Sequence, residues 1–142
     1  MTKYWIGVAS KEHVKKGVMH GIAQVCHGKQ TPLKRICPGD WIIYYSPTKI
    51  FGQKEPCRKF TAIGRFKEGE PYQFKMSDDF TAWRRDVDFV SAQDILIEPL
   101  IDKLSFIKNK TYWGFMFRFG LFEIPKSDFV LIASVMGVES GQ

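Results

Sequence analysis

The sequence of 142 residues has few of the motifs that identify enzymes and metal-binding proteins. It contains neither a P-loop nor a G-x-G-x-x-G pattern, so the two commonest glycine-rich phosphate loops are excluded. It has no apolar run of about 18 residues, so we expect no helix that spans a membrane. The first residues lack the apolar segment of a signal peptide, which favours a cytoplasmic protein.

The few histidines do not form a convincing catalytic or metal-binding group. His13, His20 and His27 are spaced seven residues apart, which on one helix would separate neighbours by about 10 Å. Cys26 precedes His27, and adjacent side chains in a strand point to opposite faces. Ser10 and His13 fit a helix cap and its third residue better than a nucleophile and its base. We therefore predict no catalysis and no cofactor.

Charge and aromatic content favour an anionic partner. The 21 Lys and Arg exceed the 15 Asp and Glu, which gives a net charge of +6 and a pI near 9.3. Such a surplus is typical of proteins that bind nucleic acid. Aromatic residues make up 15% of the chain, and their rings can build a core or stack on bases. The basic residues are scattered, which argues against a disordered basic arm.

The hydrophobic pattern predicts one α+β domain spanning residues 1–142. Short alternating runs indicate a small sheet that must curl to bury one face, and so a partly closed barrel. The strands are expected near residues 4–9, 41–46, 60–67 and 83–90. Ser10 is the expected N-cap of a helix that follows the first strand. A last helix is expected near 127–136, with Ser127 as N-cap and Gly137 as terminator.

Several residues suit a binding module. Tyr44 and Tyr45 point to opposite faces of one strand, so one ring is expected in the core and the other beside a cleft. Short polar side chains and basic side chains of a loop lie in the segments around this strand. They are Ser10, Gln24 and Ser46, which can read a base edge, and Lys29, Lys34 and Arg35, which can contact phosphates.

Six segments together resemble the EVE domain family, and the resemblance runs from about residue 3 to about 136. They are "YWIGVASKEHV", "GIAQVCHGKQTPLKRICPGDWIIYYSP", "KFTAIGRF", "WRRDVDFV", "LSFIKNKTYWGFMFRFGLFEI" and "DFVLIASVM". The resemblance implies a PUA-like fold, a bent five- or six-stranded β-barrel with flanking helices, related to PUA, ASCH and YTH domains. It also implies a nucleic-acid module that holds a single, modified base. The tryptophans of the YTH aromatic cage are not found at equivalent places.

By this resemblance, the pocket lies between Ala9 and Ser10, the segment 21–29 and the strand end 44–47. The expected ligand-binding residues are Ser10, Gln24, Lys29, Tyr45 and Ser46. Tyr45 is preferred to Tyr44 because it adjoins Ser46. The expected partner is RNA or modified DNA, with no membrane contact.

Two other functions remain open from the sequence. One is an ASCH-like enzyme that acts on a nucleoside or RNA through Lys29 or a carboxylate. The other is a small-molecule or protein-binding module whose positive charge is incidental. Turnover of nucleosides would identify the first, and binding that does not depend on salt would favour the second.

The cysteines yield a direct prediction. Cys26, Cys37 and Cys57 are odd in number and have no Cys-x-x-Cys spacing, which suits neither a disulfide framework nor a zinc site. We expect three reduced thiols in the purified protein when thiols are titrated, and no bound metal by elemental analysis. Zinc at near-unit stoichiometry would contradict this expectation.

Overall fold

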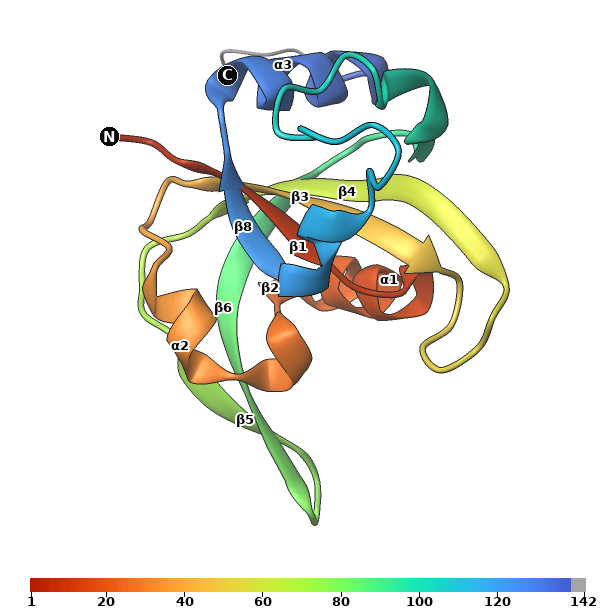
Figure 1. Ribbon diagram of the computed structural model, residues 1–142. Helices are drawn as coiled ribbons and strands as arrows, with labels where there is room; N and C mark the ends of the chain where they lie inside the picture. The colour runs from red at the N-terminus through yellow and green to blue at the C-terminus, as the bar shows by residue number, and fades with distance from the viewer. Residues whose placement is uncertain (139–142) are drawn as a thin grey trace.

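The computed structural model describes residues 1–138, in which a mixed sheet curls into a half-barrel with three α-helices around it (Figure 1). The strands are β1 (Tyr4–Val8), β2 (Ile22–Ala23), β3 (Trp41–Thr48), β4 (Pro56–Phe66), β5 (Tyr72–Ser77), β6 (Phe80–Val90), β7 (Ile95–Leu96) and β8 (Leu121–Ile124). The α-helices are α1 (Lys11–His20), α2 (Gln30–Lys34) and α3 (Lys126–Val135). Three short 3₁₀ turns are η1 (Cys26–Gly28), η2 (Glu98–Leu100) and η3 (Phe115–Phe119).

The sheet order along the main path is β2-β6-β4-β3-β1-β8. β5 pairs with β6 and β7 with β4, and only the β1–β3 pair is parallel. The predicted α+β architecture with a bent, partly closed barrel is therefore confirmed, with six strands on the main path of the sheet. None of the helices within residues 1–138 is long and apolar enough to cross a membrane.

The predicted strands and the last helix all exist, with some differences at their ends. β4 and β6 begin several residues before the predicted starts at 60 and 83. Ser127 was expected to cap α3, and this is wrong: the helix begins at Lys126 and Pro125 occupies the N-cap position. A proline suits this end of a helix because the missing N–H would have no partner there. Gly137 does end the helix, with φ of +83°.

The core has two parts because β3 is buried on both faces. Ile43 and Tyr45 point into a larger cluster covered by α3 and the segment that leads to η3. Ile42 and Tyr44 point into a smaller cluster beneath α1 and α2. Gly64 of β4 allows close packing on this second side, since an added Cβ would lie 2.4 Å from Val87 Cγ1.

Asp40 fixes the start of the parallel pair. Its carboxylate is 1% exposed and accepts three hydrogen bonds, from the backbone N–H groups of Lys3 and Cys37 at 3.0 and 2.9 Å and from Trp5 Nε1 at 3.0 Å. These donors belong to the entry to β1, to β1 itself and to the turn before β3. A single side chain thus joins the two strands at the end where their register begins, Tyr4 opposite Trp41.

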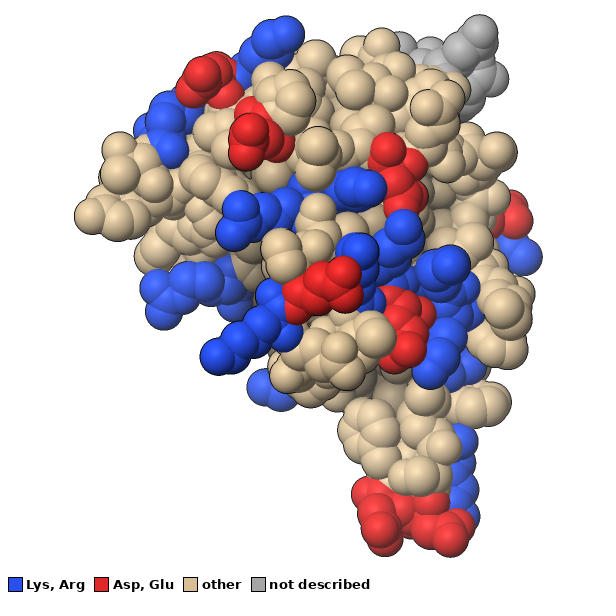
Figure 2. Space-filling model, turned by 90° about the vertical axis from the view of Figure 1, so that its right-hand side faces the viewer, with Lys and Arg blue, Asp and Glu red and all other residues tan. Residues whose placement is uncertain are grey.

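The hairpin of β5 and β6 extends from the barrel as an arm, which we define as residues 72–84 (Figure 1). All six residues of β5 are exposed. Phe74, Met76 and Phe80 remain about half exposed, although they are large and apolar. The turn at its tip carries Asp78 and Asp79, so the end of the arm is acidic (Figure 2).

Removing the Asp40 carboxylate should destabilise the fold. Asp40→Ala would remove the acceptor of three hydrogen bonds, one of them from the buried indole N–H of Trp5, and we expect the free energy of unfolding to fall by about 3 kcal/mol. Urea denaturation followed by tryptophan fluorescence measures the change. Asp102→Ala, which removes an exposed carboxylate, is the matched control and should change stability by less than about 0.5 kcal/mol. Equal effects of the two substitutions would refute the role given to Asp40.

Candidate functional site

A cavity of about 550 Å³ opens where β1 ends and α1 begins. Its walls come from segments far apart in the sequence: Val8, Ala9, Ser10, Glu12, His13, Lys16, Gln24, Val25, Cys26, His27, Gly28, Pro47, Thr48, Phe51, Met76, Phe80, Phe117, Arg118 and Gly120. The volume lies in the usual range of small-ligand sites, and a mostly apolar wall with a few polar groups is typical of them. This cavity is the candidate site.

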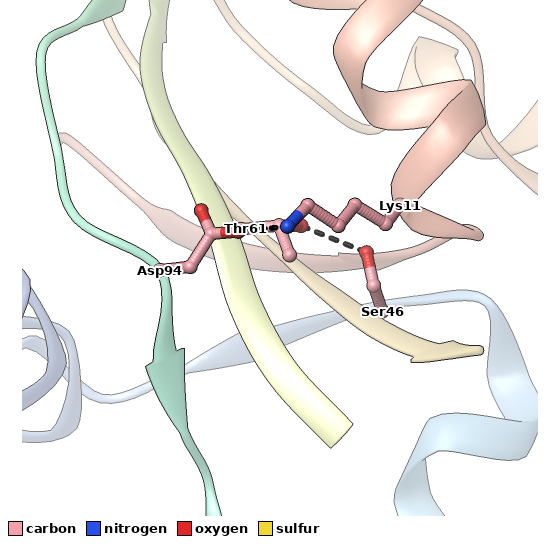
Figure 3. Close-up of polar contacts among 4 residues, drawn as sticks. All are labelled: Lys11, Ser46, Thr61 and Asp94. Atoms are coloured by element: carbon pink, nitrogen blue, oxygen red, sulfur yellow. Dashed lines mark hydrogen bonds and ion pairs between the residues drawn. The ribbon is translucent and has the colours of Figure 1, made fainter. Parts of the chain in front are cut away.

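The first wall is built by the passage from β1 into α1. Ser10 is the N-cap, and its hydroxyl accepts a hydrogen bond from the His13 N–H at 3.3 Å, so the predicted cap is confirmed. The turn is tied to the sheet, because Ala9 N–H donates to the Tyr45 carbonyl at 3.2 Å. Lys11 extends away from the cavity to Asp94, with 2.9 Å between Nζ and Oδ2 (Figure 3). These contacts hold the amino end of α1 in place.

The second wall is a tight left-handed turn. Cys26 and His27 have φ of +50° and +61°, although neither is glycine, and Gly28 follows at +80°. Such a conformation is strained for side chains with a Cβ, and strained residues concentrate at binding sites. The turn fits because glycines border it. A Cβ at Gly28 would lie 2.7 Å from Ala82 Cβ, and one at Gly120 would lie 2.8 Å from Cys26 Sγ.

Two titratable groups in these walls are held uncharged by burial. Burial lowers the pKa of His13 below its usual 6.5, and the positive charges of Lys16 and Arg84 lower it further, while a hydrogen bond with the Gln24 backbone opposes the shift. Burial also raises the pKa of the Cys26 thiol, and Lys29 and Arg35 only partly offset this. A neutral imidazole and a protonated thiol therefore face the cavity near pH 7.

The remaining walls come from segments that the sequence did not connect with the site. Phe51 lies in the loop between β3 and β4, Met76 and Phe80 lie on the arm, and Phe117 and Arg118 lie in η3. The ring of Phe51 meets the ring of His27 at a centroid distance of 5.7 Å. The sequence of the arm carries no signal that connects it with the site. The approach of the arm to α1 depends on the curl of the sheet.

A basic depression adjoins the cavity along α1. It is formed by Lys11, Glu12, Lys15, Lys16, Met19 and Lys49, and it shares Glu12 and Lys16 with the cavity. Two of these lysines are paired, Lys11 with Asp94 and Lys49 with Glu55, whereas Lys15 and Lys16 have no ion-pair partner within residues 1–138. Figure 2 shows lysine and arginine side chains gathered over this side of the molecule, with acidic side chains among them.

Two of the five predicted site residues line the cavity together, and a third lies beside it. Ser10 and Gln24 both line the cavity and are largely buried, at 7% and 6% exposure. Lys29 does not line the cavity, but it is exposed and follows Gly28, which does. Neither Lys34 nor Arg35, considered for phosphate binding, is part of the cavity wall.

Tyr45 and Ser46 are placed away from the cavity wall. The Tyr45 ring is buried in the larger cluster and stacks on Phe117 at 4.1 Å, and burial raises its pKa to about 12. Ser46 is fully buried, and its hydroxyl shares a 2.8 Å hydrogen bond with Thr61 on the next strand (Figure 3). Tyr44 is also outside the cavity wall, but its hydroxyl donates to the Gln24 carbonyl at 3.0 Å and so supports the site from behind.

The three cysteines are free, and their environments differ. Cys26 lines the cavity, Cys37 is exposed and Cys57 is buried. No group of three or more His, Cys, Asp or Glu side chains within residues 1–138 is arranged to hold a metal ion.

Comparison with solved structures defines the class of fold. The YTH domain of the Zygosaccharomyces rouxii MRB1 protein, solved in complex with N6-methyladenosine RNA, superposes with a TM-score of 0.60 at 15% identity and covers 99% of this chain and 89% of that one. A hypothetical protein from Leishmania major superposes with a TM-score of 0.61 at 12% identity, over 96% of both chains. The fold is thus that of the PUA-like domains, which include YTH.

Sequence comparison then gives the family. The model of the EVE domain matches residues 3–135, so the chain belongs to the EVE domain family, as its motifs implied. Among its relatives, the UPF0310 protein msl3206 of Mesorhizobium japonicum is 51% identical, over 96% of this chain and 93% of the relative. The UPF0310 protein YdcG of Bacillus subtilis is 45% identical, over 96% and 94%.

The lowered pKa of His13 has a measurable effect on stability. Below pH 6.5 the unfolded chain binds a proton at this residue before the folded protein does, so stability should fall as the pH drops through that range. The His13 ring should titrate below 6.5 by NMR, and His13→Gln should flatten the loss of stability between pH 6.5 and 5. A His13 midpoint above 6.5 would contradict this account.

Proposed function

We propose that this protein is a non-catalytic module that binds one base of a nucleic acid in the cavity at the amino end of α1. The observation that carries the proposal is the composition of that cavity. Apolar and aromatic side chains form most of its wall, and the buried side chains of Ser10 and Gln24 line it together with the partly buried His13. A flat, hydrogen-bonding ligand such as a base suits this combination.

The surroundings of the cavity suit an anionic chain attached to the base. Lys16 and Arg118 line the cavity itself, Lys15 lies in the adjoining depression, and the exposed Lys29 follows the left-handed turn. These cations can contact the phosphates on either side of a bound base, and such contacts set position and salt dependence rather than base preference.

Exposed rings beside the opening can contribute to binding. Phe51 is 74% exposed and Phe80 is 46% exposed, and both form part of the wall. Base–aromatic stacking is worth about 1–3 kcal/mol per base. In this proposal these two rings take the stacking role that the sequence had assigned to Tyr45, whose ring is already stacked within the core.

The likeness to the YTH domain supports a nucleic-acid ligand, since that neighbour was solved with an N6-methyladenosine RNA. Binding without chemistry is supported by the state of the reactive groups. The Cys26 thiol is held protonated by burial, and no hydrogen bond within residues 1–138 joins His13 to a carboxylate that could orient it as a base.

The proposal is tested with short single-stranded RNA and DNA oligonucleotides, each carrying one modified or unmodified base at its centre. We expect one base to bind more tightly than the others, and Gln24→Ala and Phe80→Ala each to weaken that binding by about 1–3 kcal/mol. Fluorescence anisotropy measures the affinities, and chromatography of the incubated ligands detects turnover. Equal binding of every oligonucleotide by wild type and both variants, or turnover of any ligand, would refute the proposal.

Salt dependence separates the phosphate contacts from base recognition. Lys16→Gln should make the slope of log K against log salt shallower by about 0.7, the value for one contact to a single strand, while the order of base preference stays the same. Lys126→Gln, on α3 and outside the cavity, is the matched control and should leave the slope unchanged. Identical slopes for both variants would place the phosphates elsewhere.

A further inference from the structure

Arg84 is a buried cation without a carboxylate partner. Only 8% of the residue is exposed, and none of the ion pairs formed within residues 1–138 includes it. It lies on β6, and its guanidinium stands 3.9 Å from the centroid of the Phe74 ring and 3.3 Å from Met76 Sδ, both on the arm. A ring face and a thioether satisfy little of the hydrogen-bonding capacity of a guanidinium, which can only donate.

The amide of Gln24 supplies the missing acceptor. With its oxygen turned toward Arg84, Oε1 accepts from Nη2 at 2.7 Å and from Nε at 3.1 Å. The opposite orientation would set amide N–H groups against guanidinium N–H groups, so the hydrogen-bond partners decide between the two. The forked geometry of a guanidinium also holds the plane of the amide more firmly than one donor would.

The backbone of Gln24 is fixed as well. Its carbonyl accepts from the Tyr44 hydroxyl at 3.0 Å, and Tyr44 is 2% exposed. The side chain is therefore anchored at both ends, by Tyr44 at its backbone and by Arg84 at its amide. Gln24 lines the cavity and Arg84 does not, so Arg84 contacts the amide from outside the cavity.

We infer that Arg84 is a positioning residue that fixes Gln24 as a hydrogen-bond donor toward the ligand. This inference rests on the proposed function and adds to it a criterion for which bases the cavity accepts. Because Arg84 occupies the amide oxygen, the amide has its N–H groups to offer the ligand. The site then favours a base with an oxo group at that position. An amino group there would place two donors face to face.

The inference also gives the arm a role. Phe74 and Met76 hold the guanidinium of Arg84 in place, and Met76 lines the cavity at the same time. The exposed apolar residues of β5 thus act on the ligand in two ways, as part of the wall and as support for the residue that orients Gln24.

The test compares nucleotides that differ by one amino-to-oxo exchange, namely AMP with IMP and CMP with UMP. Two-dimensional NMR titrations with the full chain measure the four dissociation constants. We expect wild type to prefer the oxo member of at least one pair by about tenfold. Gln24→Glu keeps a charge-assisted contact to Arg84 but presents an acceptor in place of donors, so it should reverse that preference.

Two variants of Arg84 complete the test. Arg84→Met frees the amide to rotate, and the preference within the pair should fall to near one. Arg84→Lys keeps a donor toward the amide oxygen and should retain part of the preference. Melting temperatures report whether each variant folds, and Gln24→Glu keeps the test decisive even if Arg84→Met does not fold.

The outcomes separate this inference from the proposed function. Binding by wild type with the same preference in Gln24→Glu would overturn the role of Arg84 and leave the cavity as the binding site. If the four nucleotides do not bind but a base from the oligonucleotide screen does, the amino and oxo forms of that base are compared instead, with the same expected reversal. Failure of every ligand to bind at the cavity would overturn both.

Discussion

The parallel pairing of β1 with β3 is the constraint on which the rest of the molecule depends. In the sequence the two strands are separated by α1, β2, η1 and α2, and the Asp40 carboxylate joins them where their register begins. Once they are paired in parallel, both run toward the same edge of the sheet. The end of β1 then lies beside the end of β3, and α1 must start at that edge. A cavity at this edge follows from the order of the strands, because the chain has to leave the sheet there.

The cavity lies between a part of the protein that is held by specific contacts and a part whose side chains are more exposed. One side is formed by the α1 start and the left-handed turn, which are tied to the barrel by capping, by Lys11 and by the close approach of Gly120 to Cys26. The other side is formed by the loop of Phe51 and by the arm, where large apolar side chains stay exposed. Preorganised polar groups favour selectivity, whereas exposed rings can adjust to what they stack on. The site combines these two properties.

Local patterns predicted the barrel well and the site in part. The run at 41–46 is almost continuously apolar and rich in branched and aromatic residues, so β3 was evident, and Ser10 was placed correctly as a cap. The choice of Tyr45 over Tyr44 had no such support, because β3 is buried on both faces and its sequence does not tell which face meets a ligand. Ser127 failed as a cap because the N-cap position is occupied by Pro125, two residues earlier, and the helix begins at Lys126. The contribution of Met76 and Phe80, and the contact of Arg84 with Gln24, depend on the curl of the sheet and have no signature in local sequence.

The shape of the arm has a consequence for how such a protein can diversify. Residues 72–84 contribute exposed side chains to the cavity, but little of the two buried clusters comes from them. Substitutions at the exposed positions of the arm would change the wall of the cavity at little cost in folding free energy, since exposed positions contribute little to the core. The barrel can therefore be retained during evolution while mutations alter the arm. Selection can then act on ligand specificity and on folding stability separately. Relatives that share this fold need not share a ligand.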